Sequence, residues 1–559
     1  MTRHFNWYII SAIVASLVLL PLLTLTWLSA SANSELWGHL ANTVLADYVV
    51  SSLSLMLGVA LLTSLLGIGS ALLVTQYHFK GVNFFHWALL LPLAMPAYIT
   101  AYSYTGLLDV AGPIQSLLRT HFELSYGQYW FPEIRSLGGA IFVLSFVLYP
   151  YVYLMARASF MEQSQHLREV AQLLGYSRRK AFFRITLPIA RPAIIAGISL
   201  ALMETLADFG AVSYFGVNSF TTGIFRTWYG LDSVEGAAQL AMILLSFVVV
   251  LLALEKSSRK RAAYHGKKTA KPGQAEHLSG KKQALAIALV CTPLLLGFII
   301  PCAQLSYWAI KNIEQLASAE FWQLVANTLL LASITACVAL FLALLVAYSH
   351  RLNQSKFTSI SKGIIGLGYA IPGLVIAVGV LIPLAYFDNT LDGWLRSNFN
   401  YSSGLLISGT IAALVIAYLV RFLAVALKSV DSGLGSIHPN MDQAARSLGL
   451  SPFGVLRQVH LPIMKGSILT GLLIVFVDVM KELPATLVLR PFNFNTLAVR
   501  AYELASDERL ADAALPSIAI VLVGLLPVIL LSRVTRISNI SRISPVARIS
   551  SGSPKTSAA

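Results

Sequence analysis

Long apolar runs alternate with short polar or basic segments along the whole chain. Each run approaches or exceeds the roughly 20 residues that an α-helix needs to cross a bilayer. The pattern predicts an all-α polytopic membrane protein with about twelve transmembrane helices in two sets of six. We expect the spans at about residues 7–28, 49–75, 84–108, 138–161, 193–216 and 237–254, and at about 284–310, 324–349, 363–387, 404–427, 467–489 and 513–531.

The first run has a rival interpretation as a signal peptide, because small residues follow it at 29–32. A signal core has roughly 7 to 15 apolar residues, and the run at 7–28 is longer. We therefore expect a retained membrane anchor.

Composition supports a membrane protein. The 559 residues are 56% hydrophobic and only 12% charged, which is more apolar surface than a soluble core can hide. The net charge of +15 would suggest nucleic acid in a soluble protein, but here the basic residues gather between the apolar runs. That distribution is typical of membrane topology and predicts no nucleic-acid partner.

A polar insert between apolar runs occurs twice. The segment that begins at Glu169 and reaches Gly175 is matched 274 residues further on by the segment from Gln443 to Gly449. The same shift relates Leu187-Pro188 to Leu461-Pro462. Such a match at fixed spacing indicates a duplicated structural unit.

The duplication divides the chain. We expect a first half at residues 1–255 with its core at about 49–255, and a second half at 284–533 with its core at about 324–533. Between them, residues 256–283 hold nine Lys or Arg against one acid and read as a basic linker. Residues 534–559 read as a basic disordered tail. Six spans per half make the repeats parallel.

Loop charges predict the orientation. Lys and Arg near span ends resist translocation, and both inserts, the linker and the tail are rich in them. Both inserts and both termini should therefore be cytoplasmic.

Each insert reads as two short helices separated by a turn. Gly175 and Gly449 can supply the left-handed conformation that ends a helix, and Ser177 and Ser451 can cap the next one. A duplicated knob of this kind suits docking into another protein. The alternative is an amphipathic linker helix on the membrane surface.

The inserts resemble the EAA loops of binding-protein-dependent ABC importers, in which Glu-Ala-Ala is followed by three residues, Gly, nine residues, Ile, one residue and Leu-Pro. The first copy matches at Glu169, Ala171, Gly175, Leu187 and Pro188, and the second matches at Ala444, Ala445, Gly449, Leu461 and Pro462. The second copy has Gln443 in place of the acid.

The resemblance implies a permease subunit in a bacterial cytoplasmic (inner) membrane. Its implied partners are two ABC ATPase subunits, which the inserts contact, and an extracytoplasmic solute-binding protein. ATP would be used by the partner subunits and no cofactor would be bound by this chain. The chain contains no Gly-x-x-x-x-Gly-Lys-Ser/Thr phosphate loop, so we expect no enzyme site in it.

A narrower resemblance concerns the cargo. The segments Glu204–Val212 and Lys481–Leu487 look like those of ferric iron permeases with two fused halves. Members of the wider group carry thiamine, phosphonates, sulfate or polyamines, and these remain alternatives.

Four carboxylates at membrane depth form the candidate translocation path. Glu204 and Asp208 in the first half correspond to Asp478 and Glu482 in the second. Charges at this depth usually face a bundle interior or a wet pathway, and hard cations favour oxygen ligands. Two structural explanations stay open: Lys481 can neutralise Asp478 or Glu482, and carboxylates can tie down helix ends. The pattern does not define a metal ligand set.

For several other residues we expect structural roles and not a direct part in transport. We expect Pro96 and Pro372 to break the third span of each half. The tyrosines at 98, 102, 104, 149, 151 and 153 could supply phenolic oxygens, but we expect them to lie at the membrane interface. The histidines at 350, 438 and 460 lie in or near the predicted cytoplasmic loops without metal-ligand company, and we expect them to be ordinary polar residues.

Two other functional classes stay open. An ion- or proton-coupled secondary carrier could use the carboxylates as proton sites, and a membrane scaffold or receptor would transport nothing.

Overall fold

The computed structural model describes residues 2–31, 34–163, 175–260 and 276–543. Helices dominate it, and π turns occur at η2, η3 and η6. The first half contains α1 (Thr2–Ser31), α2 (Ser34–Thr43), α3 (Leu45–Gln76), β1 (Tyr77–His78), α4 (Val82–Ala88), η1 (Leu91–Ala94), α5 (Ala97–Leu108), α6 (Pro113–Phe122), α7 (Leu137–Glu162), α9 (Arg178–Ala181), η2 (Phe182–Thr186), α10 (Leu187–Ala207), α11 (Gly210–Tyr214), α12 (Phe220–Gly230) and α13 (Val234–Lys260).

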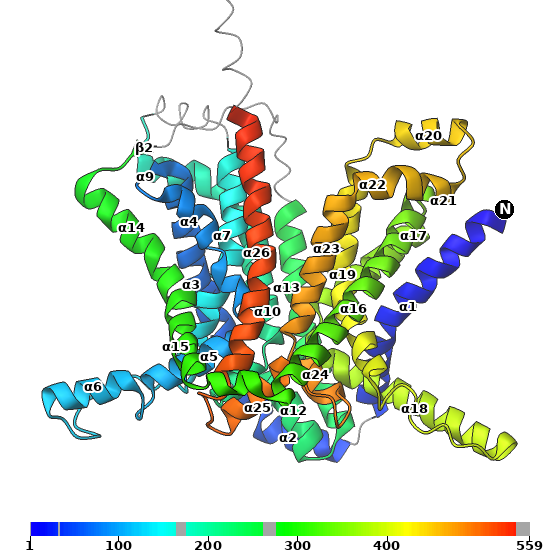
Figure 1. Cartoon of the computed structure of the whole chain (residues 1–559), viewed down its shortest axis with the longest axis horizontal. Coiled ribbons are helices and arrows are strands. Elements are labelled where there is room, and N and C mark those ends of the chain that lie inside the picture. The colour runs from blue at the N-terminus through cyan, green and yellow to red at the C-terminus, as the bar shows by residue number, and fades with distance from the viewer. Residues whose placement is uncertain (1, 32–33, 164–174, 261–275, 544–559) are drawn as a thin grey trace, which may run out of the picture.

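The second half repeats this order with small differences, as Figure 1 shows. It contains β2 (Glu276–His277), α14 (Gly280–Leu294), η3 (Leu295–Ile299), α15 (Ile300–Lys311), η4 (Ile313–Ala317), α16 (Ala319–Leu352), α17 (Lys356–Leu367), η5 (Gly368–Ala370), α18 (Gly373–Phe399), α19 (Ile411–Gly435), α20 (Pro439–Ser447), α21 (Pro452–Val455), η6 (Leu456–His460), α22 (Leu461–Ile463), α23 (Lys465–Met480), α24 (Pro484–Leu489), α25 (Leu497–Ser506) and α26 (Ala514–Ile543).

The predicted all-α membrane architecture is confirmed. Within the described residues, nine continuous helices are long and apolar enough to span a membrane, and two bent helix pairs bring the total to as many as eleven. A shorter apolar stretch at Ala514–Ile529 corresponds to the twelfth predicted span. α26 continues to Ile543, so the chain is still helical beyond residue 534, where the disordered tail was expected to begin. Residues 544–559 lie outside the described part.

The third span of each half is broken at the proline that the sequence singled out. Pro96 and Pro372 precede the first residues of α5 and α18, and both have extended backbones with ψ of 142° and 143°. In the first half the helices on either side of the break are inclined by 91°. Proline cannot donate a backbone hydrogen bond, and it disfavours helical conformation in the residue before it.

The first helix of each half packs on the opposite half. α1 contacts α16, α17, α18 and α19, while α14 and α15 contact α3 and α5. The approach is close: a methyl group at Gly379 of α18 would lie 2.6 Å from the carbonyl oxygen of Pro21 in α1. The Tyr104 hydroxyl likewise donates to the Leu296 carbonyl across the halves, at 2.6 Å. The two halves are therefore interleaved in space, although they are separate in sequence.

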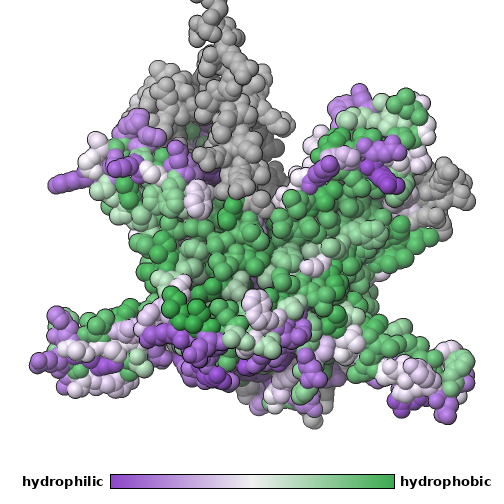
Figure 2. Space-filling model, in the orientation of Figure 1, coloured by the Kyte–Doolittle hydropathy of each residue, from purple (hydrophilic) through white to green (hydrophobic). Residues whose placement is uncertain are grey.

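Both repeat inserts lie at one end of the molecule. Figure 1 shows α9 and α20 to α22 at the same end as the start of α1 and the far end of α26. Figure 2 shows an apolar belt around the middle of the molecule with polar residues above and below it. This is the surface of a protein that spans a bilayer.

The repeated Leu-Pro pairs have a structural consequence. Pro188 and Pro462 each follow a π turn, η2 in the first half and η6 in the second. Since proline has no backbone N–H, the regular helical ladder is interrupted at this point. The repeated Leu-Pro pair thus marks the point at which each insert joins the helix that follows it.

Candidate functional site

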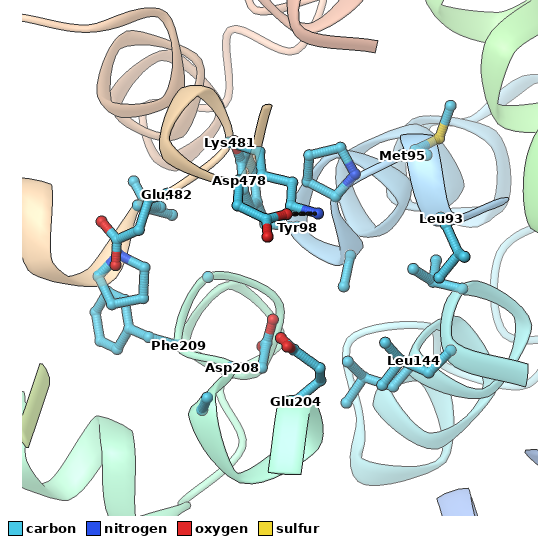
Figure 3. A pocket seen from close by; sticks show the side chains of 18 of the residues that line it. Leu93, Met95, Tyr98, Leu144, Glu204, Asp208, Phe209, Asp478, Lys481 and Glu482 are labelled. Atoms are coloured by element: carbon cyan, nitrogen blue, oxygen red, sulfur yellow. Dashed lines mark ion pairs between the residues drawn. The ribbon is translucent and has the colours of Figure 1, made fainter. Parts of the chain in front are cut away.

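A cavity of about 130 Å³ lies between the two halves. All four carboxylates of the predicted path line it: Glu204, Asp208, Asp478 and Glu482. They come from the ends of α10 and α23 and the turns that follow, which are equivalent in the two repeats. Figure 3 shows Glu204 and Asp208 together on one wall, with Asp478 and Lys481 across the space from them.

Two of the carboxylates hold helix ends. Asp208 follows the last residue of α10, and its Oδ1 accepts hydrogen bonds from the backbone N–H groups of Ala211 and Val212, at 3.0 and 3.1 Å. The first turn of a helix has free N–H groups, which carboxylates satisfy well. Asp208 therefore has a structural role in addition to lining the cavity.

Glu482 does the same in the second half. Its oxygens accept from the N–H groups of Ala485 and Thr486, at 3.0 and 3.1 Å. Arg421 of α19 also reaches Glu482, with 3.2 Å between Nη1 and Oε1. The suggestion that carboxylates tie down helix ends thus holds for one carboxylate in each half.

The other two carboxylates accept no backbone hydrogen bond from the described residues. Glu204 Oε1 accepts a hydrogen bond from the Tyr369 hydroxyl at 2.7 Å. Asp478 pairs with Lys481, with 2.9 Å between Oδ1 and Nζ. The suggested neutralisation by Lys481 is therefore present, and it acts on Asp478.

The two walls differ in charge. Arg421 and Lys481 both belong to the second half, and their repeat equivalents in the first half are Val147 and Ala207. The ion pairs among the described residues therefore leave Glu204 and Asp208 without a cationic partner. Among the described residues that line the cavity, the first-half wall has two carboxylates and no cation, whereas the second-half wall has two of each.

The tyrosines are not interfacial as expected. Tyr98, Tyr102, Tyr149 and Tyr153 are buried inside the molecule. The hydroxyls of Tyr149 and Tyr153 donate to the carbonyls of Leu89 and His86, at 2.9 and 3.1 Å. Those carbonyls lie where the third span ends its regular helix before Pro96, so the tyrosines replace hydrogen bonds that the break removes.

Two tyrosine hydroxyls remain available near the cavity. Those of Tyr98 and Tyr102 are buried and have no hydrogen-bond partner within the described part of the chain. Tyr98 lines the cavity, whereas Tyr102 packs beside it, with 5.8 Å between the ring centroids. A buried polar group without a partner is costly, so these hydroxyls are candidates for contact with water or cargo.

The second repeat insert forms two short helices as predicted. α20 ends before Gly449, whose φ of +86° is left-handed, and the Ser451 hydroxyl accepts from the N–H of Gly454 at 3.1 Å to cap α21. Ala445 is buried, while Gln443 and Ala444 are exposed. Leu448 is 83% exposed and Phe453 is 65% exposed, which leaves apolar side chains on the outer surface of the insert.

Only part of the first insert is described. Glu169 and Ala171 lie outside the described residues. Gly175 has a left-handed φ of +70°, and Ser177 is within 3.4 Å of the N–H of Lys180 at the start of α9. Leu187 and Pro188 begin α10, as Leu461 and Pro462 begin α22.

A polar network that the sequence did not reveal holds the second insert. Arg351, at the end of α16, pairs with Asp442 of α20 at 2.8 Å and also donates to the carbonyls of Leu434 and Ile437. The Nε2 of His460 lies 2.7 Å from Asp442. His460 is fully buried and takes part in this network, a role that its interpretation as an ordinary polar residue did not include.

This network changes the titration of Asp442. Burial raises the pKa of the carboxyl, but the hydrogen bonds from Arg351 and His460 outweigh that effect and hold the pKa below its ordinary value. The repeat equivalents of Arg351, Asp442 and His460 are Tyr77, Arg168 and Thr186, so the first insert cannot form the same network. In the sequence, only the difference between the two copies at these three positions could have indicated the network.

Known proteins resemble the chain along most of its length. The profile of the family described as "Binding-protein-dependent transport system inner membrane component" matches residues 64–262 and again residues 339–541. The Fe(3+)-transport system permease protein FbpB 2 of Haemophilus influenzae is 27% identical over 88% of this chain and 90% of its own length. The ferric transport system permease protein FbpB of Actinobacillus pleuropneumoniae is 23% identical over 80% of this chain and 64% of its own length.

Some relatives match a single half. The molybdenum transport system permease protein ModB of Haemophilus influenzae is 30% identical over 36% of this chain and 88% of its own length. The relatives that match both halves and those that match one are alike permease components of transport systems. The chain therefore belongs to the family of binding-protein-dependent transport system inner membrane components, as a multi-pass membrane protein in which two copies of the family's domain are fused.

Proposed function

We propose that this chain is the permease of an ATP-driven ABC importer for ferric iron. The observation that carries the proposal is the cavity between the halves, where four carboxylates meet only two cationic side chains. Glu204, Asp208 and the Tyr98 hydroxyl offer the oxygen ligands that a hard cation prefers. The names of the relatives that match both halves point to the same cargo.

The charge of the cavity also weighs against oxyanion cargo. Relatives of one half include molybdenum and sulfate permeases. An oxyanion would meet the unpaired carboxylates of Glu204 and Asp208 in a region of low dielectric constant, where repulsion between like charges is strong. The same argument applies to phosphonates, whereas polyamines and thiamine are cationic and remain the cargo alternatives.

In the proposed mechanism the two inserts transmit motion from two ABC ATPase subunits. The apolar residues Leu448 and Phe453 give the second insert a surface for docking. Arg351 and His460 join that insert to α16 and to the turn before α23, so a push on α20 reaches α23, which carries Asp478 in the cavity wall. The inserts and both termini are assigned to the cytoplasm, and a solute-binding protein would deliver cargo at the opposite face.

The test is iron uptake by the chain reconstituted with its ATPase and binding-protein partners. Glu204→Gln combined with Asp478→Asn should abolish uptake of ferric iron while the ATPase subunits stay bound. Glu314→Gln is the matched control, because Glu314 is an exposed acid that does not line the cavity. Undiminished uptake by the double variant would reject the path.

The same preparation separates the alternatives. A secondary carrier would move cargo under a proton gradient without ATP and would purify without ATPase subunits. Uptake of thiamine or polyamine in place of iron would keep the transporter class and change the cargo, and a scaffold would show no uptake.

A further inference from the structure

Two helical arms extend sideways from the end of the molecule opposite the inserts. One is α6 with the segment that returns from it, and the other is the end of α18 with the segment that leads to α19. Figure 1 shows both arms reaching beyond the bundle on opposite flanks. Neither arm belongs to the cavity or to the inserts.

The polar side of α6 is occupied by its own return segment. Arg119 donates to the Tyr129 hydroxyl at 3.0 Å and to the Val110 carbonyl at 2.7 Å. The Tyr129 hydroxyl in turn donates to Gln115 at 2.7 Å. These bonds fix one face of the helix and leave the other face open.

The open face of α6 is apolar. Ile114 and Leu117 lie on it three residues apart and are 39% and 69% exposed, and Phe122 at the end of the helix is 61% exposed. Trp130, in the return segment, is 86% exposed. In water these large apolar side chains would stay exposed, at a free-energy cost of roughly 25 cal/mol for each Å² of apolar surface.

The end of α18 is built in the same way. Asp388 accepts hydrogen bonds from the N–H groups of Ile407 and Ser408, and Asp392 accepts from Ser402 and Gly404. The two acids are four residues apart and therefore share one face, which the returning chain covers. Phe387 and Trp394 lie on another face and are 50% and 53% exposed.

We propose that both arms lie in the outer interface of the bilayer with their apolar faces in the lipid. Figure 2 shows the upper sides of the arms, toward the apolar belt, as largely apolar and their lower sides as polar. The apolar surface of each arm is thus continuous with the membrane-spanning surface. Amphipathic helices with tryptophan at the edge of the apolar region are typical of membrane interfaces.

A solute-binding protein is the competing occupant, and the direction of the apolar faces argues against it. Such a protein approaches from the aqueous side, where the arms present the return segments that bond to Arg119 and Asp392. The arms also continue helices that reach the cavity: α5 carries Tyr98, and Gly373 at the start of α18 lies against Glu482. Lipid contact at the arms would anchor the outer ends of both broken spans while the inserts move.

The test uses single-cysteine variants of the full chain, with Cys291, Cys302 and Cys337 replaced by alanine, labelled with bimane in nanodiscs. Leu117→Cys and Trp394→Cys report on the apolar faces, and Ser116→Cys and Asn389→Cys are matched controls on other faces of the same arms. Brominated phosphatidylcholine should quench the first pair at least about twofold more than the controls, and aqueous iodide should show the reverse order.

Equal quenching of the two pairs by iodide, with no effect of brominated lipid, would overturn the proposal. Protection of the Leu117→Cys label from iodide only when purified binding protein is added would overturn it as well, and would assign the arms to that partner. Neither result depends on which cargo the cavity carries.

Discussion

Asp208 and Glu482 make the same contact in the two halves: each carboxylate accepts from the backbone N–H groups three and four residues further along the chain. Glu482 has an additional partner in Arg421, whereas Asp208 has Val147 at the equivalent position. The shared contact is structural, and the difference gives the cavity its charge asymmetry.

Removal of these two carboxylates should have unequal effects on stability. Asp208→Ala removes a helix cap and should lower the free energy of unfolding by about 1 to 2 kcal/mol. Glu482→Ala removes a cap and also leaves Arg421 buried without its partner. This variant should lower the free energy of unfolding by about 3 to 5 kcal/mol. Thermal unfolding of the purified chain measures both, with Glu482→Gln as the isosteric control. Equal losses for the two alanine variants would contradict the assigned roles.

Asp478 and Lys481 should behave as a coupled pair. Each single change, Asp478→Asn or Lys481→Met, leaves the other charge in the cavity wall without its partner. The double variant should recover part of the lost stability, with a coupling free energy of about 0.5 to 3 kcal/mol in a double-mutant cycle. Denaturant unfolding of the four proteins gives this value, and strict additivity would show that the ion pair is energetically silent.

The second insert should detach at acidic pH. The pKa of Asp442 is lower in the folded protein than in the unfolded chain, where it is about 3.9. Its contribution to stability is therefore fully present above that unfolded value and is lost as pH falls through the folded pKa. The emission of an environment-sensitive fluorophore attached at Leu448→Cys before the titration should stay constant from neutral pH down to about pH 4 and change below it.

Asp442→Asn is the comparison for this titration. The asparagine cannot form the ion pair with Arg351, so the attached fluorophore should show the altered emission already at neutral pH. A titration that is the same with and without Asp442 would assign the change to other groups.

Close contact between the interleaved halves should be sensitive to one methyl group. Gly379→Ala places its Cβ 2.6 Å from the Pro21 carbonyl, so α1 must move away from α18. We expect a loss of about 1 to 3 kcal/mol in stability from this overpacking. Gly363→Ala, at a helical position with no atom within 4 Å of the added methyl, should be neutral or slightly stabilising. Thermal unfolding distinguishes them, and equal behaviour would show that the α1 contact is loose.

Much of the fold and part of the site could be predicted from the sequence. Apolar runs of bilayer length located the spans, Pro96 and Pro372 located the breaks, and Gly449, Ser451 and Pro452 located the turn and cap inside the second insert. These features depend on local chemistry, which each short segment carries by itself. The repeat also placed Glu204, Asp208, Asp478 and Glu482 at equivalent positions, and all four line one cavity.

The sequence alone determined the helical class, the duplication and the four carboxylates, because hydrophobic length and residue spacing are properties of the chain. Only the tertiary structure decided which carboxylates cap helices and which face the cavity without a cation. It also decided that His460 and Arg351 meet Asp442, and that Tyr149 and Tyr153 satisfy carbonyls in a broken span. Those outcomes depend on contacts between residues far apart in the chain, and neither periodicity nor composition records which distant groups will be brought together.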